Sequence, residues 1–190
     1  MKSIAAALTA LAACWTLSAQ ADDFTVGASA NSSSGGTPVA TISLGAGQLF
    51  SVWASATDLW SAGALPRWSN ADGLIGDLYA TGADESGEPI GTQIGANFGT
   101  WTANGFSAPY GSLVGEINGN WLLLGTSFNG AAPASGTLNL YYWDENYGDN
   151  TESILVHVNA VPEPGTWAML GVGLSLFAWR RRKAGVCPRS

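Results

Sequence analysis

The chain has 190 residues, of which 46% are hydrophobic and 11% charged, and its formal net charge is −7. The charges are unevenly placed, because thirteen carboxylates but a single base, Arg67, fall between residues 22 and 160. A segment this acidic excludes electrostatic binding of nucleic acid or of anionic lipid head groups. It is suited to solubility outside the cell and to oxygen-ligated cations such as calcium.

The first residues have the pattern of an export signal. Lys2 precedes an uncharged, Ala/Leu-rich run over residues 4–17, and a small-residue A-x-A cleavage site ends at Ala21. We therefore expect a signal peptide over residues 1–21 that engages the Sec machinery and is removed by signal peptidase. A second interpretation stays open, because the residues up to Cys14 also fit a lipobox, which would make the protein an acylated lipoprotein.

Residues 22–160 are long enough for one domain with its own core, and they contain no cysteine. Short β-like runs alternate with turn residues such as Gly45-Ala46-Gly47 and Asn118-Gly119-Asn120, and no helical periodicity extends beyond two turns. We therefore expect an all-β domain, a jelly-roll-like β-sandwich. The expected strands are 24–30, 39–44, 48–57, 74–81, 112–117, 121–126, 137–143 and 153–161.

The loop after the strand expected at 137–143 is rich in oxygen ligands. Its side-chain carboxylates and amides belong to Asp144, Glu145, Asn146, Asp149 and Asn150. Calcium takes six to eight oxygens in proteins, and a glycine within the loop allows the chain to turn back so that both ends face one point. The loop is therefore a candidate calcium site, with a merely solvated hairpin loop as the alternative.

The order of several short segments carries a resemblance to a known family. Residues 108–117 and 132–141, followed by Asp144 and then Gly148-Asp149-Asn150, resemble the PA-IL family of bacterial galactose-binding lectins, and residues 39–63 fit that family's opening strands. The resemblance implies a small, galactose-binding-like jelly-roll sandwich that holds one calcium ion, whose coordination is completed by two neighbouring hydroxyls of galactose.

The resemblance also implies particular ligands. Asp144 matches the ligand aspartate, Asp149 and Asn150 match the paired side-chain ligands, and Asn146 and Ala62 fall where backbone carbonyls contribute. The family's further sugar contacts come from a loop that corresponds roughly to residues 68–73 here and lacks the family's histidine. The resemblance therefore supports calcium binding better than it supports galactose binding. We expect sugar contacts from residues in or beside the relevant loops, namely Trp60, Trp68, Asp72, Trp143 and Tyr147.

Other residues in the domain point away from catalysis. We expect most of its remaining tryptophans, Trp53 and Trp121 among them, to be core residues. His157, the only histidine, lies in an expected strand with no serine or cysteine nucleophile motif near it in the sequence. Adjacent carboxylates such as Asp84 and Glu85 normally diverge and make poor acid–base pairs. We therefore do not expect an enzyme.

Near the C-terminal end, Val161-Pro162-Glu163-Pro164 precedes an apolar run, residues 166–179, and then the basic cluster Arg180-Arg181-Arg182-Lys183. This order over residues 161–183 resembles the PEP-CTERM sorting signal of Gram-negative exopolysaccharide-producing bacteria. The resemblance implies processing by the membrane protease exosortase at or near Pro162–Pro164. As a helix the apolar run is about 21 Å long, short of a bilayer core of about 30 Å. We therefore expect a single transmembrane helix that holds the protein transiently, followed by a tail, residues 184–190, without assigned function.

These observations predict a protein exported across the inner membrane, anchored there until processing, and then placed at the cell surface or in the extracellular matrix. We expect a calcium-dependent, lectin-like module that binds exopolysaccharide or cell-surface glycan. The main alternative is a non-catalytic structural protein of the biofilm matrix without specific sugar binding. An accessory module of an enzyme is the third interpretation, weakened because no second domain accompanies residues 22–160.

Overall fold

The structure of the protein is a computed structural model that describes residues 21–160. The predicted signal peptide apart from Ala21, the Pro162-Glu163-Pro164 string, the transmembrane helix predicted at 166–179 and the basic residues Arg180, Arg181 and Arg182 lie outside the described residues. Over residues 21–160, no helix is long and apolar enough to span a membrane.

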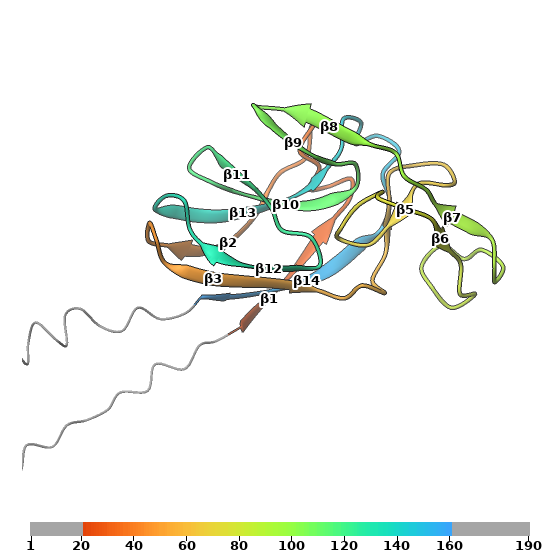
Figure 1. Cartoon of the computed structure of the whole chain (residues 1–190), viewed down its shortest axis with the longest axis horizontal. Coiled ribbons are helices and arrows are strands. Elements are labelled where there is room, and N and C mark those ends of the chain that lie inside the picture. The colour runs from red at the N-terminus through yellow and green to blue at the C-terminus, as the bar shows by residue number, and fades with distance from the viewer. Residues whose placement is uncertain (1–20, 161–190) are drawn as a thin grey trace, which may run out of the picture.

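The described residues form two antiparallel four-stranded sheets and three short two-stranded pairs (Figure 1). The first sheet has the strand order β1 (Ala21–Gly27), β14 (Ser153–Ala160), β3 (Leu49–Ala54) and β12 (Ser127–Ala131). The second has the order β11 (Asn120–Leu123), β10 (Ser112–Ile117), β13 (Gly136–Trp143) and β2 (Val39–Leu44). The pairs are β4 (Trp60–Ser61) with β5 (Trp68–Ser69), β6 (Leu78–Tyr79) with β7 (Gln93–Gly95), and β8 (Thr100–Ala103) with β9 (Phe106–Pro109).

The two large sheets enclose one hydrophobic core. Val52 on β3 and Val156 on β14 belong to the same buried cluster as Leu113 on β10 and Leu140 on β13. Strands β3, β13 and β14 alternate buried and more exposed residues at least in part, as expected when one face of a sheet is packed. The predicted all-β sandwich is confirmed.

The observed strands agree with the expected ones in part. The strands at 39–44 and 112–117 have the predicted bounds, and β13 begins one residue early. The strand predicted at 74–81 is wrong, since only Leu78–Tyr79 is extended there and paired. The β8–β9 hairpin was not predicted, although its turn is Asn104-Gly105 with φ of 54° and 76°, a strong hairpin signal.

The pleat of β3 corrects one sequence-based expectation. Phe50, Val52 and Ala54 point into the core and are at most 1% exposed. Successive side chains of a strand point to opposite faces. Trp53, predicted as a core residue, therefore lies on the outer face of its sheet and is 53% exposed.

Candidate functional site

The loop that follows β13 forms one wall of a hollow at an end of the sandwich. Ser61 and Thr151 exchange backbone hydrogen bonds of 3.0 and 3.1 Å, which bring the chain near residue 62 against this loop. The hollow has a volume of about 160 Å³. We call it the acidic hollow, and it is lined by Ala62, Arg67, Phe98, Tyr110, Asp144, Glu145, Asn146 and Asp149.

Hydrogen bonds within the loop direct its polar side chains toward one another. The backbone N–H of Asn146 donates to Asp144 Oδ2 at 3.4 Å, and the amide Nδ2 of Asn146 donates to Asp149 Oδ1 at 2.9 Å. The N–H of Gly148 donates to Asn146 Oδ1 at 3.2 Å, which closes the turn. The structure therefore brings together Asp144, Asn146 and Asp149, as the sequence predicted, with Ala62 beside them.

Asp144 has the electrostatic setting of a carboxylate that would gain from a cation. Asp144 is only 5% exposed. Burial raises its pKa, and the nearby charge of Asp149 raises it further, against hydrogen bonds from the Asn150 side chain and from backbone amides of the loop. A bound divalent cation would offset both the lost hydration and the repulsion between the two carboxylates.

Asn150 contributes a buried oxygen that has no partner. The residue is 5% exposed, and its Nδ2 donates to the carbonyl of Ala28 at 3.3 Å. Its Oδ1 has no hydrogen-bond partner within residues 21–160. An orphaned buried acceptor is costly, about 1–3 kcal/mol, unless it coordinates an ion or a water. The Asn150 side chain also hydrogen-bonds Asp144, and a hard cation such as calcium takes amide oxygens as well as carboxylates.

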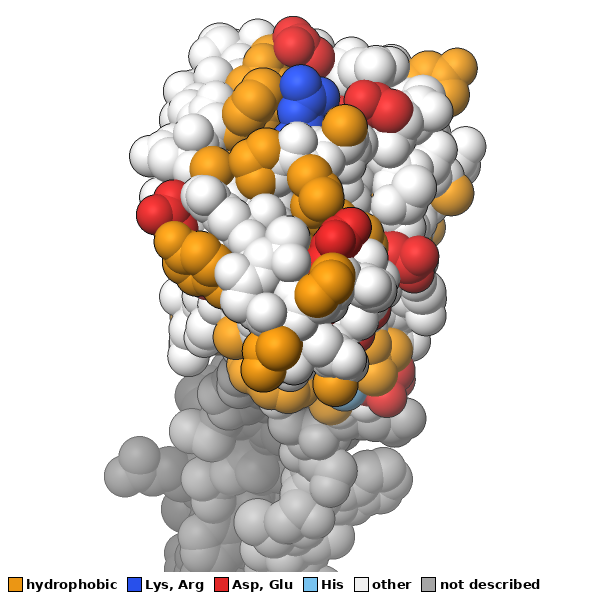
Figure 2. Space-filling model, turned by 90° about the vertical axis from the view of Figure 1, so that its right-hand side faces the viewer, with side chains coloured by type: hydrophobic (Ala, Val, Ile, Leu, Met, Phe, Trp, Pro, Cys, Tyr) orange, Lys and Arg blue, Asp and Glu red, His pale blue; other side chains and the backbone are white. Residues whose placement is uncertain are grey.

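The acidic hollow also holds a cation that the sequence interpretation missed. The guanidinium of Arg67 lies 3.8 Å from Asp149 Oδ2, and its Nη1 donates to the carbonyl of Ala62 at 3.5 Å. It is held 4.7 Å above the ring of Phe98. Figure 2 shows this single basic side chain of the described residues beside acidic and apolar ones. Arg67 therefore contacts two of the five predicted metal ligands, and its isolation in an acidic segment was the signal that could have pointed to it.

The wall opposite the loop is aromatic. Phe98, 46% exposed, meets Tyr110 edge-on with ring centroids 5.4 Å apart. Burial raises the pKa of the Tyr110 phenol, as do the charge of Glu145 and a hydrogen bond with its carboxylate. The hollow thus sets oxygen ligands against an apolar wall, which is the combination that sugars, with hydroxyls and apolar ring faces, can use.

Two of the five predicted sugar contacts are corrected by the structure. Trp60 is 0% exposed, and its Nε1–H donates to the Gly111 carbonyl at 2.9 Å, so the indole belongs to the core. Trp143 is also 0% exposed and donates to the Trp101 carbonyl at 3.0 Å. Neither ring can stack on a sugar without unfolding its surroundings.

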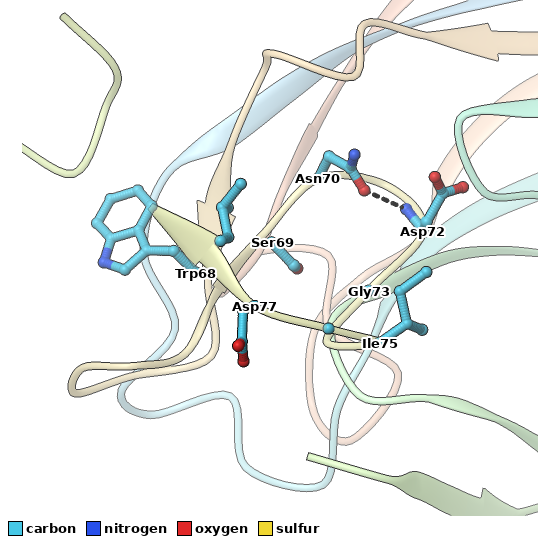
Figure 3. A pocket seen from close by; sticks show the side chains of 9 residues that line it. Trp68, Ser69, Asn70, Asp72, Gly73, Ile75 and Asp77 are labelled. Carbon is cyan, nitrogen blue, oxygen red and sulfur yellow. Dashed lines mark hydrogen bonds between the residues drawn. The ribbon is translucent and has the colours of Figure 1, made fainter. Parts of the chain in front are cut away.

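The other three predicted sugar contacts do not line the acidic hollow. Trp68 and Asp72 line a separate hollow with Asn70 and Ile75, where the Asp72 N–H donates to Asn70 Oδ1 (Figure 3). The Asp72 carboxylate accepts from the N–H of Thr126 at 2.7 Å, which ties two loops together. Tyr147 is 49% exposed, but its ring lies against the backbone of Gly35.

Acidic side chains alone do not make a metal site here. Over residues 21–160 there is no group of three or more His, Cys, Asp and Glu side chains that could hold a metal ion. A calcium ion in the acidic hollow would therefore depend on amide, backbone and external oxygens in addition to Asp144 and Asp149.

Comparisons with known proteins cover the fold and the C-terminal end. No curated protein matches the chain. One similar solved structure is the EclA N-terminal domain, described as a PllA-like lectin: it has 21% sequence identity and a TM-score of 0.45, over 73% of this chain and 95% of that chain. Residues 160–183 match the PEP-CTERM protein-sorting motif. The chain therefore carries a PEP-CTERM sorting motif that begins at the last residue of β14, Ala160.

Proposed function

We propose that the protein is an exported, exosortase-processed module that binds saccharides through calcium in the acidic hollow. The observation that carries the proposal is the convergence of oxygens from distant parts of the chain: the Ala62 carbonyl, the carboxylates of Asp144 and Asp149, and Asn146 line one space. Asn150 follows in the same loop, its side chain hydrogen-bonds Asp144, and its own Oδ1 is buried without a partner among the described residues. The expected target is exopolysaccharide or a cell-surface glycan.

Each residue of the hollow has a defined task in this proposal. Asp144, Asp149 and Asn150 would hold the ion by side-chain oxygens, and Ala62 and Asn146 by backbone carbonyls. Calcium, when bound, would supply a cation that coordinates neighbouring sugar hydroxyls. Phe98 and Tyr110 would cover the apolar side of the sugar ring and exclude water from it. Glu145, which hydrogen-bonds Tyr110, would keep this wall in place.

The position of the sorting motif is compatible with release of an intact domain. β14 ends at Ala160 and lies between β1 and β3 in its sheet. Cleavage at or near Pro162–Pro164 falls beyond Ala160, so it leaves intact the strand pairing seen within residues 21–160. Transient membrane anchoring by the apolar run and removal of the signal peptide by signal peptidase complete the proposed route.

Calcium calorimetry followed by sugar titration tests the proposal. The chain, purified in a detergent without a sugar head group, is expected to bind one calcium ion and then galactosides or related saccharides. Chelation is expected to remove the sugar binding. Saccharide binding in the hollow that persists in chelator would contradict the calcium mechanism, and saturable calcium binding without any sugar would favour the structural alternative.

One observation favours that alternative, a structural protein of the extracellular matrix. The Arg67 guanidinium already forms an ion pair with Asp149 and contacts the Ala62 carbonyl. An internal cation can hold the loop closed without an external one. In a metal-free structural loop Arg67 keeps its contacts with Asp149 and Ala62. In a calcium site the ion displaces Arg67 from them.

Replacement of Arg67 by Met is expected to tighten calcium binding by about 1.4- to fivefold. Arg67 and the ion share Asp149 and the Ala62 carbonyl, and exposed ion pairs of this kind are worth about 0.2–1 kcal/mol. Met keeps an apolar stem over Phe98 but removes the charge. Calorimetry of wild-type and variant protein gives the ratio, with Arg67→Lys as the charge-retaining control. An unchanged or weakened affinity would show that Arg67 supports the loop instead of competing for it.

A further inference from the structure

The outer face of the β1–β14–β3–β12 sheet carries an aromatic surface that the acidic hollow does not use. Trp53 stands on β3, an inner strand of this sheet, and is 53% exposed, and Leu155 on the neighbouring β14 is 43% exposed. A large apolar side chain left open at the centre of a sheet is more informative than one at a rim.

The Trp53 ring is held in place by a row of residues across three strands. Trp53 is the cross-strand partner of His157, and His157 is the partner of Asp23. The two rings stack with centroids 4.9 Å apart and planes 27° from parallel. The imidazole is fixed in turn by Asp23, whose Oδ1 lies 2.6 Å from its Nδ1. The indole therefore presents a pre-oriented flat surface, which lowers the entropy lost on binding.

A hollow of about 320 Å³ opens beside this ring, near the lower end of the roughly 300–1,000 Å³ typical of small-ligand sites. Its polar side is built from the segment after β3. Asp58 Oδ2 accepts from the N–H of Leu155 at 2.7 Å, and the hydroxyls of Ser55 and Thr57 are 2.9 Å apart. We call it the Trp53 hollow, and it is lined by Trp53, Ser55, Thr57, Asp58, Glu85, Leu155 and His157.

The lining chemistry selects among ligand classes. An aromatic plane beside hydroxyls and carboxylates suits a ligand with an apolar face and several hydroxyl donors. Glu85, Asp58 and Asp23 place negative charge around the hollow, and no Lys or Arg of the described residues lines it, so anionic ligands are disfavoured. A flat apolar partner surface would leave these polar groups without hydrogen bonds. A neutral saccharide can pack its apolar ring face on the indole and donate its hydroxyls to the polar groups.

We propose that the Trp53 hollow is a second, calcium-independent binding site for neutral saccharides, with the indole of Trp53 as the stacking surface for a sugar ring. This site shares no lining residue with the acidic hollow. It does not depend on the function proposed for that hollow. If both sites bind, one molecule holds two saccharide segments and gains avidity on a long polymer without any new contact.

The test is calorimetric titration of the full chain, in a detergent without a sugar head group and in the presence of EDTA. The probes are neutral hexasaccharides of glucose, mannose and galactose, with a uronate hexasaccharide as the anionic comparison. At least one neutral probe is expected to bind, and Trp53→Ala is expected to weaken it by about tenfold or more, as for an aromatic anchor of an interface. Trp53→Phe is expected to keep part of the affinity, and the uronate to bind more weakly.

Two control variants show whether a loss of affinity comes from the Trp53 hollow itself. Leu49→Ala alters an exposed apolar residue on the same strand and face but outside the Trp53 hollow, and is expected to leave binding unchanged. Asp144→Asn, which disables the acidic hollow, is expected to retain binding in EDTA. Failure of every neutral probe, or equal binding by Trp53→Ala, overturns the proposal. Loss of self-association in Trp53→Ala without any saccharide binding also overturns it, and would identify the face as an interface between copies.

Discussion

Replacement of Asp144 by Asn is expected to abolish the calcium-induced stabilisation of the domain. Ligand binding at a free calcium concentration about 100 times Kd stabilises the folded state by about 2.7 kcal/mol, and a variant that cannot bind loses all of it. Asp144 is the most buried carboxylate of the acidic hollow and lies next to Asn150 and Asp149. An amide keeps its size but removes the charge that holds the ion.

The same substitution is expected to have the opposite effect without calcium. Burial and the charge of Asp149 raise the pKa of Asp144 above its ordinary value, so the folded domain binds this proton more tightly than the unfolded chain. Its stability therefore falls as pH rises from the ordinary carboxyl pKa through the raised one, and the loss is complete once the pH exceeds the raised pKa. Asp144→Asn removes this loss, so the metal-free variant is expected to be at least as stable as the wild type at about pH 7.

Urea unfolding in EDTA and in calcium measures both effects. Wild-type protein should show a calcium-dependent increase in midpoint, and Asp144→Asn none. Asp77→Asn is the matched control, because it makes the same charge change at an exposed residue outside the acidic hollow. A calcium response in Asp144→Asn equal to that of the wild type would remove Asp144 from the site.

The loop was predictable from the sequence because its ligands are local. Asp144, Asn146, Asp149 and Asn150 lie within one connection between β13 and β14, so the composition alone indicated an oxygen-rich turn. Only Ala62 comes from elsewhere, and it was placed by resemblance to a family. Arg67 was missed because its contact with Asp149 joins residues far apart in the sequence, through a two-residue pair of strands, β4 and β5, that no hydrophobic pattern indicated.

The tryptophans show why the alternation of side chains along a strand was insufficient to predict which residues are buried. Because side chains alternate along a strand, Leu138, Leu140 and Tyr142 share one face of β13, and all three are buried. Trp143 lies on the opposite face by the same rule yet is equally buried, because the unpredicted β8–β9 hairpin packs over it. Among residues 21–160, no hairpin covers Trp53 in this way, and it is 53% exposed. Exposure of an outward-facing residue thus depends on which loop crosses it, and a single sequence gives little information on that.

Replacement of Trp143 by Ala is therefore expected to act on stability, with a cost of about 3–5 kcal/mol, as for other buried aromatic residues. The ring contacts Trp101, Phe106 and Trp121 with centroids 4.7, 5.3 and 5.3 Å away. Its N–H also bonds the Trp101 carbonyl. This aromatic group joins the β8–β9 hairpin to the second sheet, so the hairpin should detach before the sandwich unfolds.

Hydrogen exchange and urea unfolding distinguish detachment of the β8–β9 hairpin from unfolding of the whole sandwich. Amide protection in residues 100–109 is expected to fall more in Trp143→Ala than protection in β3 or β14. The reason is that Trp143 belongs to the aromatic cluster on the outer face of the second sheet, whereas β3 and β14 pack into the main core between the two sheets. Trp53→Ala is the matched control: it removes the same side chain from an exposed position and should cost far less. If Trp143→Ala instead lost saccharide binding with unchanged stability and unchanged hairpin protection, the ring would be a ligand contact after all, and the packing of β8–β9 over β13 would be wrong.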